Sequence, residues 1–327
     1  MKKNILRWAE TAAYCMAIIL RYTFPSKWRY LVGDIVRKTF SQQILRLLNE
    51  RFFPVLFDGC KIESEVDYLT LECYVPLKLN LDLSDGTEAG FWLAAEPVLS
   101  GYLERVLDSS AVFVDVGANF GFYSLLASIR CNAKAIICIE PNPTTFDRLK
   151  KNIEKNKINA RLFNLGLSDK NEDAELHEFP LNRGGSSINA KNTERRVLER
   201  WEQKMFGKAD YSKIHKIECV SFDDLIQTGD IKDIMNEEKI VIKIDAEGHD
   251  TNILMGMHQF IDSYKGKLVL IVEAYRPEQE HMEDLLSRHG FKKYYIDGTK
   301  GILTENVVYL EANYDDLVFL RNSTLSE

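Results

Sequence analysis

The residues with the clearest chemical meaning lie in one short stretch, Val112–Tyr123. An apolar strand ends there near Asp115, and two glycines, Gly117 and Gly121, follow before the next helix begins. Glycines in such a turn let backbone N–H groups come close to a ligand. A dinucleotide-binding turn reads G-x-G-x-x-G, but Asn119 replaces its second glycine and the third comes too early. The Asp115 carboxylate would also repel a pyrophosphate, so a ligand with an ammonium or hydroxyl group fits better.

A second acidic residue, Glu140, follows the next apolar strand, nineteen positions after Gly121. An acidic side chain about 20 positions beyond a glycine turn is where ribose hydroxyls are bound. S-adenosylmethionine carries a ribose, an ammonium and a sulfonium group, so the turn, Asp115 and Glu140 together predict this cofactor. The residues expected to contact it are Asp115, Gly117, Asn119, Gly121, Tyr123, Glu140, Pro141, Asn142, Ser168, Asp169 and Asp245.

Another polar cluster, Asp245, Glu247 and His249, comes directly after the apolar stretch Ile240–Ile242. The carboxyl ends of parallel strands line the ligand site, so these side chains are expected to face the cofactor or the acceptor. Methyl transfer to a hydroxyl needs an oriented nucleophile and removal of its proton. Asp245 is the first candidate for acceptor binding or base, and Glu247 the second, as an orienting group. His249 is either a base or a residue that caps or packs at the start of the following helix.

An oxygen-rich set of this kind leaves a divalent cation open as an alternative, although we assign no metal. Glu273 follows a further apolar strand at the same edge, where it either recognises the acceptor or forms a salt bridge. Ser168 and Asp169 end the third expected strand, where an adenine would lie. Ser186 and Ser187 either bind a polar acceptor or serve a turn.

A sheet is needed to bring these residues together, and from residue 111 onward the sequence shows the alternation of strands and helices that forms one. Near-continuous apolar strands that alternate with helices predict a parallel sheet covered on both faces. The expected strands are Ala111–Val116, Ala135–Ile139, Ala160–Leu167, Ile240–Ile244 and Leu268–Val272, with helices Phe122–Arg130 and Thr144–Asn156 among them. A closing antiparallel pair, Val307–Leu310 with Leu317–Leu320, makes the sheet mixed but mostly parallel.

The first hundred residues follow a different pattern. Apolar residues at helical spacing predict two or three helices before residue 60, and alternating runs predict short strands over 60–83. A helix is expected over 91–107. We therefore divide the chain into a helical and short-strand extension, residues 1–100, and a ligand-binding domain, residues 101–327.

In this order the motifs resemble those of FkbM-type methyltransferases, over roughly Glu96 to Phe291. The matching segments are Asp115–Tyr123, Glu140–Pro143, Asn164–Asp169, Gly185–Ser187, Phe222–Leu225, Lys243–Gly248 and Ile271–Glu273. The resemblance implies an α/β, Rossmann-like class I methyltransferase fold, S-adenosylmethionine as donor, and O-methylation of a sugar or secondary-metabolite hydroxyl. It adds Glu96, just before the domain, to Glu273 as an acceptor contact. The family usually has a small residue where His249 stands, which favours capping or packing over a role as base.

Composition and charge narrow the setting. Hydrophobic residues make up 45% and charged residues 28%, as in folded soluble proteins. The apolar run Ala12–Leu20 is too short to span a membrane, and the six scattered cysteines indicate a reducing, cytoplasmic environment. The net charge of −7 includes ten basic against three acidic residues up to position 51. The acidic remainder argues against nucleic acid, whereas the basic arm suits either peripheral membrane contact or packing on the domain.

The sequence therefore predicts a methyltransferase that modifies a hydroxyl of a sugar, glycolipid or related metabolite, with a small-molecule or glycan acceptor as its partner. Two alternatives stay open. A catalytically inactive cofactor-binding scaffold would bind the cofactor but not need Asp245 or Glu247. A nicotinamide-dependent oxidoreductase would need the glycine that Asn119 replaces. The oligomeric state and the acceptor's identity are left open.

Overall fold

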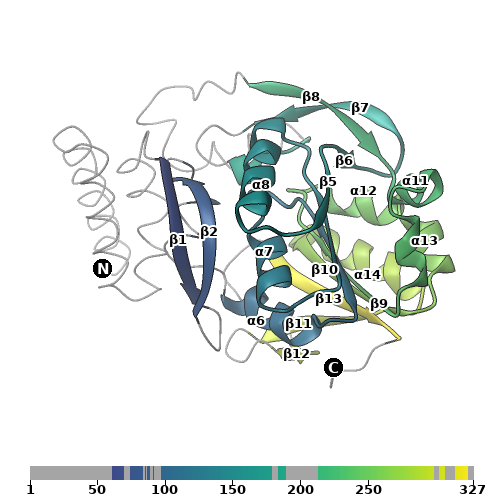
Figure 1. Cartoon of the computed structure of the whole chain (residues 1–327). Coiled ribbons are helices and arrows are strands. Elements are labelled where there is room, and N and C mark those ends of the chain that lie inside the picture. Colours follow the sequence, from purple (N-terminus) through teal and green to yellow (C-terminus); the bar gives the residue numbers. More distant parts are fainter. Residues whose placement is uncertain are drawn as a thin grey trace, which may run out of the picture. The chain divides into compact units, whose positions relative to one another are not determined.

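The computed structural model describes residues 61–69, 74–83, 85, 87, 88, 91, 97–178, 183–188, 213–297, 302–305 and 314–322 (Figure 1). The helices predicted before residue 60, Glu96 and the strand predicted over 307–310 lie outside these residues. The chain forms two compact units, residues 1–97 with 179–184, and residues 98–178 with 185–327. The predicted division near residue 100 did not anticipate that 179–184 would join the first unit.

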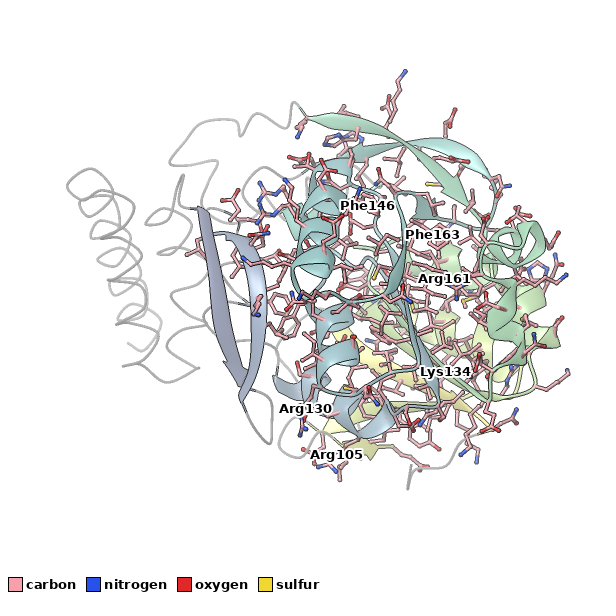
Figure 2. All side chains as sticks on the ribbon, in the orientation of Figure 1. Arg105, Arg130, Lys134, Phe146, Arg161 and Phe163 are labelled. Carbon is pink, nitrogen blue, oxygen red and sulfur yellow. The ribbon has the colours of Figure 1, made fainter. Side chains whose placement is uncertain are left out.

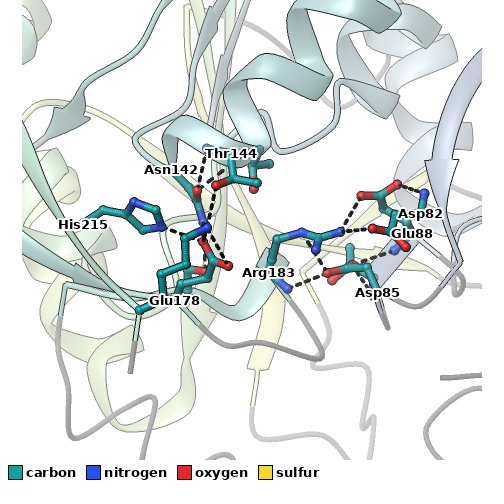
Figure 3. A network of polar contacts seen from close by, with 12 residues as sticks. Asp82, Asp85, Glu88, Asn142, Thr144, Glu178, Arg183 and His215 are labelled. Atoms are coloured by element: carbon teal, nitrogen blue, oxygen red, sulfur yellow. Dashed lines mark hydrogen bonds and ion pairs between the residues drawn. The ribbon is translucent and has the colours of Figure 1, made fainter. Parts of the chain in front are cut away.

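The first unit contains an antiparallel hairpin of β1 (Lys61–Leu69) and β2 (Tyr74–Asp82), which pair from Lys61↔Asp82 to Leu69↔Tyr74. Alternate leucines of β2 are buried, as one covered sheet face requires. In the same unit the Arg183 guanidinium lies among three buried carboxylates, 3.2 Å from Asp82, 3.5 Å from Asp85 and 3.4 Å from Glu88 (Figure 3). This ion-pair group fixes a residue from the middle of the chain to the N-terminal unit.

The second unit is built on an eight-stranded sheet with the order β12-β11-β13-β10-β9-β3-β4-β5. Its strands are β3 (Ala111–Val116), β4 (Ala135–Ile139), β5 (Ala160–Phe163), β9 (Lys239–Ile244), β10 (Lys267–Tyr275), β11 (Lys292–Asp297), β12 (Ile302–Thr304) and β13 (Tyr314–Arg321). The five strands from β10 to β5 are parallel, and β13, β11 and β12 add antiparallel pairs. The predicted mixed, mostly parallel sheet is confirmed.

Helices cover both faces of this sheet (Figure 1). In the described part of this unit they are α6 (Pro97–Val106), α7 (Phe122–Ile129), α8 (Pro143–Lys155), α11 (Phe222–Thr228), α12 (Asp250–Met255), α13 (His258–Ser263) and α14 (Gln279–Ser287), with short turns η2 (Lys232–Asn236) and η3 (Arg276–Glu278). A further short turn, η1 (Arg183–Gly185), falls where the chain passes from the first unit to the second. Val112 and Val114 pack in one core cluster with Phe260 and Leu286, while Phe113 between them is also fully buried. Burial on both faces explains why these strands are apolar without alternation.

The predicted third strand, Ala160–Leu167, is wrong as one element. The chain leaves the main sheet after β5, and β6 (Gly166–Leu167) joins β8 (Ile214–Val220) and β7 (Glu172–His177) in a separate sheet of order β6-β8-β7. Asn164 holds the bend, because its side chain donates hydrogen bonds to the carbonyls of Glu140 and Pro141 at 2.8 and 3.2 Å. A Cβ on Gly166 would lie 2.7 Å from Cys219 Sγ, so glycine allows the close approach to β8.

Two further boundaries differ from prediction. The strand β10 continues to Tyr275, so Glu273 lies inside it and not at its end, and β13 inserts between β10 and β11. Arg130 and Lys134 lie on the surface of the second unit (Figure 2). Arg130 pairs with Glu104, and Lys134 pairs with Glu237. In the described part of the chain, none of the helices has the length and apolar character that crossing a membrane requires.

Candidate active site

The glycine loop that follows β3 forms the first side of the site. Gly117, Asn119 and Gly121 all have left-handed backbone angles, with φ of 73°, 52° and 94°. A Cβ on Gly117 would lie 1.9 Å from the carbonyl oxygen of Asp245. Gly117 is therefore required where the loop after β3 meets the loop after β9, which joins the two predicted halves of the site. Only glycine fits this position, since both its angle and its neighbour exclude a side chain.

Glu140, at the end of β4, ties the glycine loop to the start of α8. Its carboxylate accepts hydrogen bonds from the backbone N–H of Asn119 at 2.8 Å and of Asn142 at 2.9 Å. Burial raises the pKa of Glu140 to about 7, although these two N–H donors oppose the rise. A carboxylate has about four acceptor positions, so Glu140 can still accept bonds from a diol.

Asn142 caps α8, and its neighbours belong to a polar network on the second unit (Figure 3). Its side-chain oxygen accepts from the N–H of Thr144 at 3.0 Å, and its amide donates to Glu178 at 3.3 Å. Glu178 in turn lies 2.6 Å from His215 Nε2. Asn142 is 1% exposed, so its side chain is held by these protein contacts and not by solvent.

Asp115 is also buried, with 1% of its surface exposed. The Ser124 hydroxyl donates to its Oδ2 at 2.6 Å, and Lys243 Nζ lies 4.0 Å from its Oδ1. Burial raises the pKa of Asp115, and Lys243 and Ser124 oppose that rise. Tyr123 stands beside this group, with its ring centroid 5.1 Å from Lys243 Nζ.

The second side of the site is an acidic edge formed by Asp245, Glu247 and Glu273. All three are partly exposed, and one carboxylate oxygen of each lies within 4.8 Å of the others. Glu247 adopts a left-handed φ of 53°, which turns the loop at the end of β9. Oxygens at this spacing can hold a divalent cation, but exposed acids often gather without one, and the ammonium of Lys243 already lies 3.0 Å from Asp245. We assign no metal ion to this edge.

Two further residues shape the acidic edge: Asp250, for which the sequence predicted no role, and Ser187, for which it left acceptor binding and a turn open. The Asp250 carboxylate accepts from the N–H of Ala246 at 2.8 Å and of Gly248 at 3.1 Å, and burial raises its pKa to about 7. The Ser187 hydroxyl donates to the carbonyl of Glu247 at 2.9 Å. The Asp-x-x-x-x-Asp spacing of Asp245 and Asp250 after β9 was the available signal for Asp250, since short acids commonly bond nearby backbone.

The structure groups the other candidates separately. His249 Nε2 lies 3.0 Å from Ser168 Oγ, and Ser168 donates to Asp169 at 3.1 Å. Ser168 is fully buried beside the small sheet, and Asp169 is exposed. Burial lowers the pKa of His249, and its side chain makes no capping hydrogen bond at α12. His249 thus occupies the N-cap position of α12 without capping that helix through its side chain. Its packing at the start of the helix stays a prediction, as does Ser168 as an adenine contact.

The site thus combines a glycine loop after β3, a carboxylate after β4 and acidic side chains after β9. This is the arrangement of an α/β protein of the methyltransferase class. A family model described as the methyltransferase FkbM domain matches residues 115–293, and the chain belongs to this family.

Two relatives set the level of similarity. The hexuronic acid methyltransferase AglP of Haloferax volcanii is 26% identical over 167 residues, which cover 51% of this chain and 58% of AglP. Methyltransferase sdnD of Sordaria araneosa is 27% identical over 198 residues, covering 57% of this chain and 75% of sdnD. The alignment with AglP thus spans little more than half of that protein. A solved FkbM methyltransferase from Methylobacillus flagellatus KT has 15% identity and a TM-score of 0.40, covering 66% of this chain and 44% of its own.

Proposed function

We propose that this methyltransferase takes the methyl group of S-adenosylmethionine and transfers it to a hydroxyl of a sugar, glycolipid or secondary metabolite. The observation that carries the proposal is the meeting of the loops after β3 and β9 at Gly117 and Asp245, because it sets the predicted cofactor residues beside the acidic edge. S-adenosylmethionine supplies a methyl group already activated by its sulfonium, so the protein has to position the reactants and accept one proton.

The residues divide this work. Glu140 is placed to accept hydrogen bonds from the ribose hydroxyls, while the loop it holds presents backbone N–H groups. Asp245 and Glu247 are the groups we assign to the acceptor hydroxyl, Asp245 as the base and Glu247 as an orienting group. Asp245 is partly exposed, with about a third of its side chain open to solvent, so an acceptor can reach it. His249 contacts Ser168, which makes it the weaker candidate for a base.

A sugar or related polyol is the acceptor class that best suits the edge. Carboxylates bind hydroxyls through short, strong hydrogen bonds, and Glu273 adds a third carboxylate beside Asp245 and Glu247. The similarity to AglP, which by its name acts on a hexuronic acid, supports a sugar acceptor. We propose no nucleic-acid partner. Contact of the basic N-terminal arm with a membrane surface, and a cytoplasmic location, remain proposals from the sequence.

Calorimetric titration with S-adenosylhomocysteine, with NAD as control, tests the cofactor assignment. We expect micromolar binding of the first and none of the second. Glu140→Ala should weaken binding by about 1.5–3 kcal/mol, because a charge-assisted contact is lost, whereas the exposed Glu175→Ala on β7 should leave it unchanged. Binding of NAD alone would favour the oxidoreductase, and binding without turnover on any sugar or metabolite acceptor would favour the inactive scaffold.

A further inference from the structure

Lys243 is a charged residue inside a strand that is otherwise built for the core. It is 3% exposed, and its neighbours Ile242 and Ile244 are fully buried. In the sheet it lies directly beside Asp115, its register partner on β3. Its ammonium reaches the carboxyl ends of both strands, 3.0 Å from Asp245 Oδ2 and 4.0 Å from Asp115 Oδ1.

A buried ammonium costs several kcal/mol in lost hydration unless nearby groups compensate it. Here two carboxylates and the face of the Tyr123 ring do so. Burial alone would lower the pKa of Lys243, but Asp245 and Asp115 outweigh it and hold that pKa above its usual value. Lys243 is therefore a permanent cation at neutral pH and cannot serve as a base.

The charges around this lysine come from several elements. The groups that act on Lys243 or its carboxylates are Asp115 on β3, Tyr123 and Ser124 on α7, Cys138 and Glu140 on or after β4, Asp245 after β9, Asp250 on α12, Glu273 on β10 and Asp316 on β13. The Lys243 ammonium lies within 4.0 Å of both Asp115 and Asp245. Without it, the buried Asp115 carboxylate would face the partly exposed Asp245 carboxylate with no cation between them.

We propose that Lys243 is a positioning residue, whose ammonium joins Asp115 beneath the glycine loop to Asp245 at the acidic edge. By holding both carboxylates, it fixes the position of the cofactor side of the site relative to the acceptor side. The inference rests on the proposed function for the identity of the two sides, but the ion-pair triad itself can be tested without any cofactor.

The first experiment compares thermal unfolding of the wild type, Lys243→Met and the matched control Lys239→Met between pH 5 and pH 8, without ligand. Lys239 lies at the other end of β9, where it pairs at 3.1 Å with Asp108, whose side chain is half exposed. The Lys243 ammonium opposes the rise in the Asp115 pKa that burial causes, so removing it raises that folded-state pKa further above its unfolded value. The folded variant then holds an extra proton, so its stability falls as pH rises through this window.

We expect the gap in Tm between Lys243→Met and wild type to widen by about 5 °C from pH 5 to pH 8. The gap for Lys239→Met should stay nearly constant, because the half-exposed Asp108 carboxylate stays in contact with water when the ammonium is removed. A gap for Lys243→Met that is equally large at every pH would overturn the proposal, since Lys243 would then only fill space.

A second variant covers the case in which Lys243→Met does not fold. The double variant Asp115→Asn/Lys243→Met removes both buried charges, and removing both partners of an ion pair is less damaging than removing one. We expect it to fold and to unfold at a higher temperature at pH 8 than Lys243→Met. A double variant that is less stable than Lys243→Met would contradict the role of Lys243 as partner of Asp115.

Titration with S-adenosylhomocysteine then connects the triad to the site. We expect Lys243→Met to weaken binding at least about tenfold and Lys243→Arg, which keeps the charge, to restore most of it. Binding unaffected in Lys243→Met would refute the positioning role even if the stability result held. If the wild type itself does not bind, the proposed function fails, while the unfolding experiment still decides whether the triad exists.

Discussion

The glycine loop and the acidic edge lie at adjacent strand ends but are built in different ways. Around the glycine loop the acids are buried, and Glu140 holds backbone N–H groups with both of its oxygens. At the acidic edge Asp245, Glu247 and Glu273 are partly exposed. Buried acids that hold backbone make a fixed frame, whereas exposed carboxylates can meet a substrate. We infer that the loop side is a frame for the cofactor, which is the same in every reaction. The acidic edge is then the place where the acceptor, which can differ, is bound.

The largest effect should come from the point where the two regions meet. Gly117→Ala places a Cβ 1.9 Å from the Asp245 carbonyl at a φ of 73°, so the loops must separate. We expect a loss of more than about 3 kcal/mol in unfolding free energy and no measurable S-adenosylhomocysteine binding. Gly229→Ala is the matched control, since its φ is 98° but nothing lies within 4 Å of the added Cβ.

The control should cost only about 1 kcal/mol, from the backbone angle alone. Thermal unfolding and calorimetry measure both variants. If Gly117→Ala behaved like Gly229→Ala, the two loops would not meet in solution and the comparison between them would lose its basis.

The next effect should be confined to the acidic edge. Asp245→Asn removes the proposed base while keeping its shape, so we expect turnover to fall about 10²–10⁴-fold with cofactor affinity nearly unchanged. The control Asp173→Asn changes an exposed acid on β7. Steady-state kinetics and calorimetry separate the two quantities. A large loss of cofactor affinity in Asp245→Asn would mean that this residue belongs to the frame and not to the acidic edge.

A third prediction uses pH to test the frame. Because burial raises the pKa of Glu140 to about 7, and the ionised form is the better acceptor for ribose hydroxyls, S-adenosylhomocysteine should bind more tightly as pH rises through 7. The free energy of unfolding changes in the opposite direction. Between about pH 4.5 and 7 the folded state holds an extra proton on Glu140, so the stability that this group contributes falls as pH rises through that range and is lost above it. Glu140→Gln should abolish the pH dependence of binding.

Asp250→Asn is the control for this experiment, because the pKa of Asp250 is also about 7 but its carboxylate bonds the backbone of its own loop. The pH dependence of binding should survive in that variant. Binding in Glu140→Gln that still changes by about tenfold across pH 6–8 would mean that Glu140 does not meet the cofactor.

Sequence patterns predicted some residues of the frame and of the acidic edge and missed others. The continuous apolar runs that became β3, β4 and β9 showed where three strand ends would meet, so Glu140 and Asp245 could be placed from the sequence. The break at Asn164 could not be placed from the sequence, because the Asn164 side chain holds it by donating hydrogen bonds to carbonyls more than twenty residues away. Lys243 was also missed as a functional residue, since only the register of β9 against β3 brings it beside Asp115.

The smallest effect tests whether the edge is supported from outside. The Ser187 hydroxyl donates to the Glu247 carbonyl at 2.9 Å, and the segment around it pairs with His177 of β7. Ser187→Ala removes one hydrogen bond to the backbone of the edge, worth about 1 kcal/mol. We expect acceptor KM to rise about fivefold, with kcat and cofactor affinity little changed. Ser110→Ala, an exposed serine distant in sequence, is the control. If Ser187→Ala weakened cofactor binding instead, the segment would belong to the frame, and the edge would be supported only by Asp250 and Lys243.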